Sequence, residues 1–237
     1  YLNQSMVAAV SGGHPYSDTP APKVFGKVSP FDPQLFYRMN DLADALLAGE
    51  CDGKYSPIEV AQWIEDYAAA ATKSLAGAKG GSAEYRRMAI DVAIQAGLGR
   101  FFGAKFRSGV LYRIYQKTNQ RAALEQSLAQ YRKARAAWAE LAETAKGVYM
   151  TDVTIGELPQ LRGHWLDRLP AMDRDISAIE KELGSAKTGE NDAKATAAIR
   201  EALDRPERAV LRCEHNPPSH LVAGSAIDLA IAVPAHA

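Results

Sequence analysis

The most regular pattern in the chain is LEQSLAQYRKARAAWAELAETA, residues 124–145. Apolar side chains return there at alternating steps of four and three, and Arg135 fills the one position of the series that is not apolar. The apolar members are Leu124, Leu128, Tyr131, Trp138, Ala142 and Ala145. A seam that lasts about three heptads predicts a long helix packed against an antiparallel neighbour.

The expected neighbour is the segment just before it, from about Ser82 to Lys117. Its apolar pattern is interrupted by Gly97, Gly99 and Gly103. A glycine inside a helix costs about 1 kcal/mol relative to alanine. The helix is therefore expected either to bend at these glycines or to admit another backbone at close range.

Two more helices are predicted nearer the N-terminus. One is expected to begin at Asp32-Pro33, with aspartate as the N-cap and proline in the first turn, and to end at Gly49. The other begins with SPIE, residues 56–59, which is a capping box with proline in the first turn, and its glycines from Gly77 onward end it.

The C-terminal third is more broken. Residues 147–163 form a long polar loop, a helical stretch follows from His164 to Leu183, and a short helix ends near Leu203. Residues 209–214 and 227–233 have strand patterns, and two strands alone do not make a stable sheet. The fold class predicted is mainly α, a bundle of long antiparallel helices with a truncated β-strand segment at the C-terminus.

The predicted organisation has three parts. Residues 1–31 form an irregular linker, 32–203 a helical bundle domain, and 204–237 the start of a β-sandwich-like domain that is cut off. The chain begins with Tyr1 rather than methionine and ends in a short apolar segment, so we expect a piece of a longer, multidomain protein.

Composition narrows the function classes. The 237 residues carry 28 basic and 28 acidic side chains, and a neutral balance argues against a nucleic-acid binder. No apolar run approaches the roughly 18 residues of a membrane span, so no membrane partner is expected. Cys51 and Cys213 lie far apart and are expected to be unpaired.

The neutral total hides two opposed blocks. Residues 39–66 hold seven acidic residues against Lys54, and residues 100–135 hold nine basic residues against Glu125. Either the two blocks pair or are simply solvated, or the basic helices face an anion such as a uronic-acid sugar, a phosphate or an acidic partner.

Sequence motifs of catalysis are missing. The four predicted bundle helices contain no histidine, which disfavours a di-metal bundle site, and there is no HExxH, P-loop, dinucleotide fingerprint or GxSxG. Cys213-Glu214-His215 lacks the two further ligands that zinc needs. No metal, cofactor or catalytic residue is predicted.

The best candidate for ligand binding is RGHWLDR, residues 162–168, which follows the long loop with Tyr149. Trp165 could stack on a sugar ring while charged neighbours hydrogen-bond its hydroxyls; alternatively the segment anchors the loop to the bundle. Trp63 and Trp138, within helices, are expected in the core. The candidate residues are Arg162, His164, Trp165, Asp167, Arg168 and Tyr149, with His14 and Tyr16 from an N-terminal turn.

Four stretches carry a family resemblance. They are VSPFDPQLFY (28–37), GKYSP (53–57) with VAQWIE (60–65), LRGHWLDRLP (161–170) and RCEHNPP (212–218). Together they resemble the helical region that follows the catalytic barrel in large bacterial glycoside hydrolase-like proteins, of the α-glucuronidase or hexosaminidase general type. The resemblance implies catalytic acids in an upstream barrel and a β-sandwich after the helices.

Two functions are left open. The resemblance implies a non-catalytic accessory domain that supports the barrel, lends loop residues to a sugar-binding cleft, and belongs to a periplasmic or secreted protein. Its expected partners are neighbouring domains of the same polypeptide and carbohydrate. The alternative is a helical-hairpin module that binds another protein, although no repeat with a period of about 34 residues is found.

Overall fold

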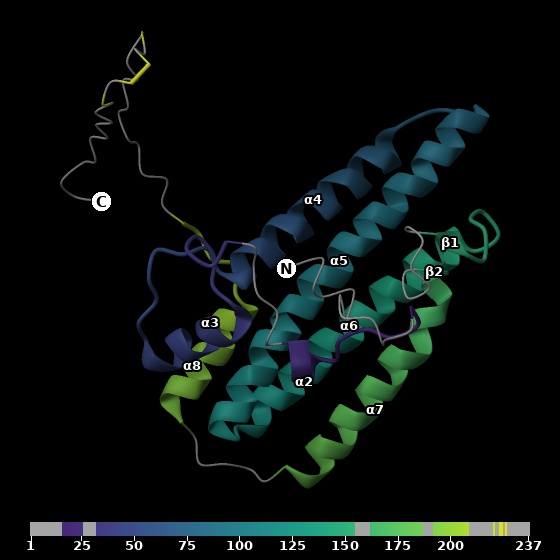
Figure 1. The fold of residues 1–237 in the computed structure, drawn as a ribbon. Helices are drawn as coiled ribbons and strands as arrows, with labels where there is room; N and C mark the ends of the chain where they lie inside the picture. The colour runs from purple at the N-terminus through teal and green to yellow at the C-terminus, as the bar shows by residue number, and fades with distance from the viewer. Residues whose placement is uncertain are drawn as a thin grey trace. The chain divides into compact units, whose positions relative to one another are not determined.

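The structure is a computed structural model that describes residues 16–25, 32–154, 162–186, 192–208, 220, 223–224 and 226. The chain divides into two units, 1–205 and 206–237. The first is a mainly α-helical bundle, as predicted (Figure 1). The two strand patterns of the tail, together with Cys213 and His14, lie outside the described residues.

The centre of the first unit is an antiparallel pair, α5 (Ala83–Thr118) and α6 (Arg121–Ala145) (Figure 1). Asn119 turns the chain between them in the left-handed region, at φ 54°. The predicted heptad seam of α6 is buried against this core. Its fully buried members include Leu124, Tyr131, Trp138, Ala142 and Ala145.

The glycines of α5 serve close packing. A Cβ on Gly97 would lie 2.8 Å from Cβ of Leu141 in α6, and one on Gly99 would lie 3.0 Å from Cβ of Ala68. A Cβ on Gly99 would also lie 3.2 Å from the backbone carbonyl of Ile64, so the expectation that these glycines admit another backbone at close range is confirmed. α5 runs through them as one continuous helix.

Helix α4 (Pro57–Gly77) packs along α5 (Figure 1). The predicted capping box is present: the Ser56 hydroxyl accepts from Glu59 N at 3.0 Å, and the Glu59 carboxylate accepts from Ser56 N at 2.7 Å. The prediction of a core position for Trp63 on this helix is wrong. Trp63 is 40% exposed and rests edge-on against Tyr55, because no described element covers that face of α4.

The start of the preceding helix is also corrected. α3 spans Met39–Ala48 rather than beginning at Asp32. Asp32 caps only a turn, accepting from Gln34 N at 2.9 Å. The chain then leaves the helical path because Tyr55 N donates to Leu35 O and Tyr37 N donates to Tyr55 O. The predicted end is confirmed, with Gly49 at φ 76°.

The remaining elements close the bundle. A two-residue ribbon pairs β1 (Val153–Thr154) antiparallel to β2 (Arg162–Gly163), with Val153 opposite Gly163. The 3-10 turn η2 (Trp165–Arg168) leads into α7 (Leu169–Ser185), which packs on α6. α8 (Ala193–Leu203) packs on α3 and α5, and the short α2 (Pro22–Phe25) packs on α5.

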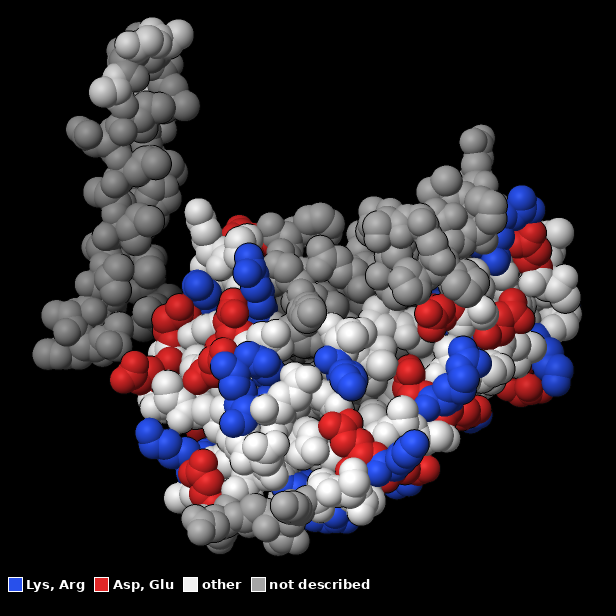
Figure 2. Space-filling model, turned by 60° about the horizontal axis from the view of Figure 1, so that its bottom comes forward, with Lys and Arg blue, Asp and Glu red and all other residues white. Residues whose placement is uncertain are grey.

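The two charge blocks of the sequence meet in the fold and pair in part. Asp44 of α3 lies 3.3 Å from Lys117 and 3.7 Å from Arg113, and Glu65 of α4 pairs with Arg107 at 3.1 Å. Other bases of the block pair elsewhere, as Arg135 does with Asp173 of α7 at 2.8 Å. Figure 2 shows basic and acidic side chains interspersed over one face. None of the described helices has the length and apolar character of a membrane span.

Candidate functional site

The two candidate segments predicted from the sequence meet in the fold. The Tyr16 ring lies over Gly163, where an added Cβ would come within 2.2 Å of Tyr16 Cδ1, and the Arg168 guanidinium stacks on the same ring at 4.2 Å. Arg168 Nη1 also donates to Asp18 O at 3.5 Å. Segments about 150 residues apart are thus joined in one buried contact.

Within the second segment, His164 and Asp167 act as a helix cap. The His164 backbone N donates to Asp167 Oδ2 at 2.7 Å, and His164 Nδ1 accepts from Leu166 N at 3.2 Å. The carbonyl of Trp165 accepts from Trp138 Nε1 at 2.7 Å. These bonds fix the entry into α7 against α6, which is the anchoring role that the sequence left open.

Only part of the predicted set faces solvent. Arg162 is exposed and pairs with Asp152 at 2.7 Å. Tyr149 is partly exposed, donates to Asp91 and meets the half-buried Trp165 ring edge-on at 5.3 Å. Their role in sugar binding stays a prediction.

Behind Arg168 lies a buried polar network that the sequence analysis did not identify. Lys105 has no exposed surface, and its Nζ donates to Thr19 Oγ1 at 2.8 Å and lies over the rings of Phe25 and Phe101. Burial lowers the pKa of Lys105 to about 7, against the opposing charges of Asp175 and Asp18. Nearby, the Tyr131 hydroxyl donates to Asp175 Oδ2 at 2.8 Å.

We call this set the closed network: Tyr16, Asp18, Thr19, Lys105, Tyr131, Arg168 and Asp175. Burial raises the pKa of Tyr131 well above its ordinary value and also raises that of Asp175. A perturbed amine is a mark of catalytic sites, but here it is held between two aromatic rings with no exposed surface. These contacts join the N-terminal segment to α5 and η2, and they join α6 to α7.

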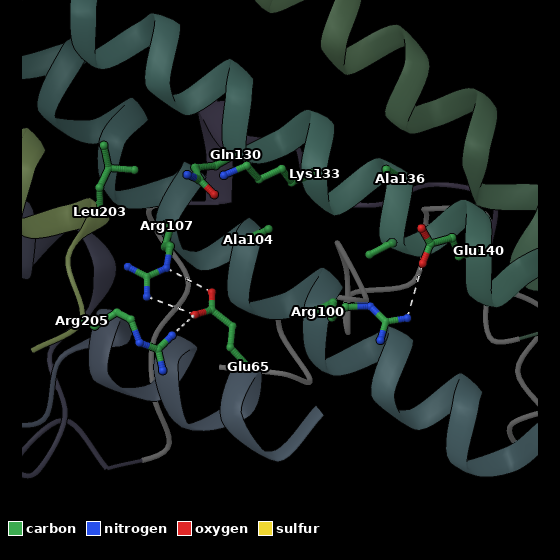
Figure 3. A pocket seen from close by; sticks show the side chains of 11 residues that line it. Glu65, Arg100, Ala104, Arg107, Gln130, Lys133, Ala136, Glu140, Leu203 and Arg205 are labelled. Carbon is green, nitrogen blue, oxygen red and sulfur yellow. Dashed lines mark hydrogen bonds and ion pairs between the residues drawn. The ribbon is translucent and has the colours of Figure 1, made fainter. Parts of the chain in front are cut away.

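A second polar cluster is open. A pocket of about 530 Å³ lies among α4, α5, α6 and the end of α8, which is within the usual range for small-molecule sites (Figure 3). We call it the arginine pocket. Its charged and amide lining comprises Glu65, Arg100, Arg107, Gln130, Lys133, Glu140 and Arg205.

One end of the arginine pocket is a structural clamp. Arg107 binds both oxygens of Glu65, at 3.1 and 3.2 Å, and its Nη1 donates to the carbonyls of Ala202 and Asp204. A cation suits the carbonyl end of α8. Gly103 makes room for this clamp, because an added Cβ would lie 2.7 Å from Glu65 Cγ.

The other end is loosely held. Arg100 makes only long contacts, 3.4 Å to Glu140 Oε2 and 3.4 Å to Thr72 Oγ1. Among the described residues, no ion pair or hydrogen bond is found for Lys133 or for the Gln130 amide. Figure 3 shows both side chains on the α6 wall of the pocket.

Sequence reasoning found the basic block but not the pocket. Arg100, Arg107 and Lys133 all belong to that block. Only the packing of α4 and α8 shows that Arg107 is held by Glu65 and by the Ala202 carbonyl. Within the described ranges, no cluster of three or more His, Cys, Asp or Glu could hold a metal ion. Cys51 is an exposed free thiol.

Comparisons with known proteins give one distant structural likeness. No family model matches the chain, and no curated protein matches its sequence. A solved GH138 enzyme, described as targeting pectin rhamnogalacturonan II, has a similar fold with a TM-score of 0.56 and 13% identity. The match covers 71% of this chain and 28% of that enzyme's chain.

Proposed function

We propose that this chain is a non-catalytic helical domain of a larger carbohydrate-active protein of the glycoside hydrolase-like kind. Its role is to support a neighbouring catalytic domain of the same polypeptide. The observation that carries the proposal is the fold similarity to part of a GH138 enzyme, which takes up 28% of that enzyme's chain.

The side-chain arrangement is consistent with a supporting role. The described titratable residues with the most perturbed environments, Lys105 and Tyr131, are buried and make structural contacts. A hydrolase of this class ordinarily needs two carboxyl groups facing each other across a cleft. In the arginine pocket, Glu65 is clamped by Arg107, which suits a structural carboxylate better than a general acid.

The surface around Trp165 is the proposed place where this domain contributes to a sugar-binding cleft. The partly exposed rings of Tyr149 and Trp165 and the exposed Arg162 lie beside the β1–β2 ribbon. Aromatic faces beside a guanidinium are suited to sugar stacking and to hydrogen bonds with hydroxyl groups.

Two measurements test the proposal. The purified chain should release no product from aryl glycosides or from rhamnogalacturonan II oligosaccharides, whereas turnover that a single side-chain substitution abolishes would overturn it. The complete coding sequence should join this region to a barrel domain with two close carboxylates. A reading frame that encodes this chain alone would also overturn it.

An interaction module is the second candidate, and one observation favours it. The α4–α5 hairpin exposes Tyr67 and Met88, at 75% and 61%, in addition to Trp63. Isolated exposed apolar residues are normal, but three large ones on one hairpin are compatible with a protein partner. In that case Tyr67→Ser would abolish partner binding and leave the fold intact.

A further inference from the structure

The arginine pocket has a charge pattern that sets the ligand it can take. Four cations line it, and three of them have a carboxylate partner: Arg107 with Glu65 at 3.1 Å, Arg205 with Asp66 at 2.5 Å, and Arg100 with Glu140 at 3.4 Å. Lys133 is the fourth, and no partner for it is found among the described residues. The surplus is therefore one positive charge, on the α6 wall.

Two further polar side chains of α6 line the pocket, the uncharged amide of Gln130 and the carboxylate of Glu140. The Gln130 residue is only 8% exposed, and no described residue takes a hydrogen bond from its amide or gives one to it. An amide offers two donors and an acceptor. Glu140 lies ten residues further along α6, about 15 Å along the helix axis, and meets Arg100 only at the outer limit of a hydrogen bond. The Gln130 amide, one turn before Lys133, can therefore bond to a ligand beside Lys133 without breaking an existing contact.

We propose that the arginine pocket binds a small hydroxylated monocarboxylate, with the carboxylate held by Lys133 and the hydroxyl groups by Gln130 beside it, while Arg100 adds positive charge to the same pocket (Figure 3). This goes beyond the supporting role proposed above and does not depend on it.

Two physical arguments set the chemical class. A single negative charge balances the surplus on Lys133, whereas a phosphate dianion would bring excess negative charge beside Glu65 and Glu140. The Gln130 amide can donate hydrogen bonds to hydroxyl groups and accept them, and the hydrocarbon chain of a simple aliphatic acid offers it no such partner. No aromatic ring lines the pocket, so the ligand is recognised by polar contacts and an open-chain acid should bind as well as a ring form.

The test is isothermal titration of the chain with four ligands: D-gluconate, D-glucuronate, D-glucose and inorganic phosphate. Both carboxylates should bind, with affinity that falls as sodium chloride rises from about 50 to 500 mM because the contacts are partly exposed charges. Glucose should bind at least about tenfold more weakly because it lacks the charge. Absence of carboxylate binding, or phosphate or glucose binding that equals it, would overturn the proposal.

Variants locate the site. Lys133→Gln and Gln130→Met should each weaken gluconate binding about tenfold, which corresponds to one lost charge-assisted or buried hydrogen bond. Lys73→Gln is the matched control, since Lys73 is exposed on α4 outside the pocket lining and carries the same charge. If Lys133→Gln binds like the wild type, or if Lys73→Gln weakens binding equally, the assignment to this pocket fails. Circular dichroism of each variant separates loss of binding from loss of fold.

These outcomes are separable from those of the proposed function. A chain that binds gluconate but is encoded without any catalytic domain would overturn the supporting role alone. A chain encoded beside a barrel that binds none of the four ligands would overturn the pocket assignment alone.

Discussion

The closed network and the arginine pocket use the same kinds of residues to opposite effect. Both lie along α5 and both contain arginine, lysine and carboxylate side chains. In the closed network, the cation of Lys105 is enclosed by Phe25 and Phe101 and has no exposed surface. In the arginine pocket, Lys133 is exposed on the wall of a 530 Å³ space.

We infer from this difference that solvent access and the balance of partners, rather than residue type, separate the architectural cluster from the proposed binding pocket. Buried charges must be satisfied internally, so their loss affects folding. Exposed surplus charge contributes little to stability, so its loss should affect binding and leave the fold intact. Substitutions in the two regions should therefore give opposite results in stability and binding assays.

The largest loss of stability is expected for a substitution at Trp138, which borders the closed network. Trp138→Ala should lower the free energy of unfolding by about 3–5 kcal/mol, because it leaves a cavity beside Phe101 and frees the Trp165 carbonyl. Trp63→Ala is the control and should cost about 1 kcal/mol or less, since that ring is 40% exposed. Urea unfolding measures both, and equal losses would contradict the distinction between these two tryptophans.

From the sequence, both tryptophans are predicted to lie in the core because both lie within predicted helices. Periodicity identifies which residues share a helix face, and it correctly located the seam of α6, the capping box of α4 and the mainly α fold. It cannot say whether another element covers that face. Trp63 stands on an uncovered face of α4, while Trp138 is enclosed by α5 and η2.

The candidate site was harder to predict for the same reason. Arg168 and Tyr16 were each singled out from local composition, but their contact depends on a long-range packing that a local pattern does not contain. The sequence contains only a weak indication that Lys105 is buried, which is its position between Phe101-Phe102 and Phe106 on one helix. The arginine pocket needed the packed positions of three helices and the residues after α8.

A smaller loss of stability is expected for a substitution at Tyr131. Tyr131→Phe removes the hydroxyl that donates to Asp175 at 2.8 Å and leaves a partly buried carboxylate without this donor. The expected loss is about 1–2 kcal/mol in the free energy of unfolding. Tyr67→Phe, on an exposed ring, should change it by less than about 0.5 kcal/mol. A Tyr131→Phe protein as stable as the wild type would mean that the network hydrogen bond contributes nothing.

The closed network should also make stability depend on pH. The pKa of Lys105 is lowered to about 7 in the folded state, whereas an unfolded lysine titrates near about 10.4. Between these values the unfolded chain binds more protons, so stability rises with pH from about 7 toward 10.

The comparison that isolates this effect is wild type against Lys105→Met by urea unfolding at pH 6.5, 8 and 9.5. The wild type should gain stability across the series relative to the variant, in which the titrating amine is gone. A parallel pH dependence in the two proteins would contradict the assignment of this titration to Lys105.

The smallest effect on stability is expected in the arginine pocket. Arg100→Gln breaks only long, exposed contacts with Glu140 and Thr72, so the free energy of unfolding should change by less than about 0.5 kcal/mol. The same substitution should weaken gluconate binding several-fold. A loss of stability comparable to that of Tyr131→Phe would place Arg100 with the architectural residues instead.

The most direct test of the division between the two regions is a two-dimensional ¹⁵N–¹H NMR titration of the chain with D-gluconate. Chemical-shift changes should concentrate at Arg100, Gln130 and Lys133, with Tyr16, Lys105 and Arg168 unchanged. Changes centred on the closed network, or no changes at millimolar gluconate, would contradict the account.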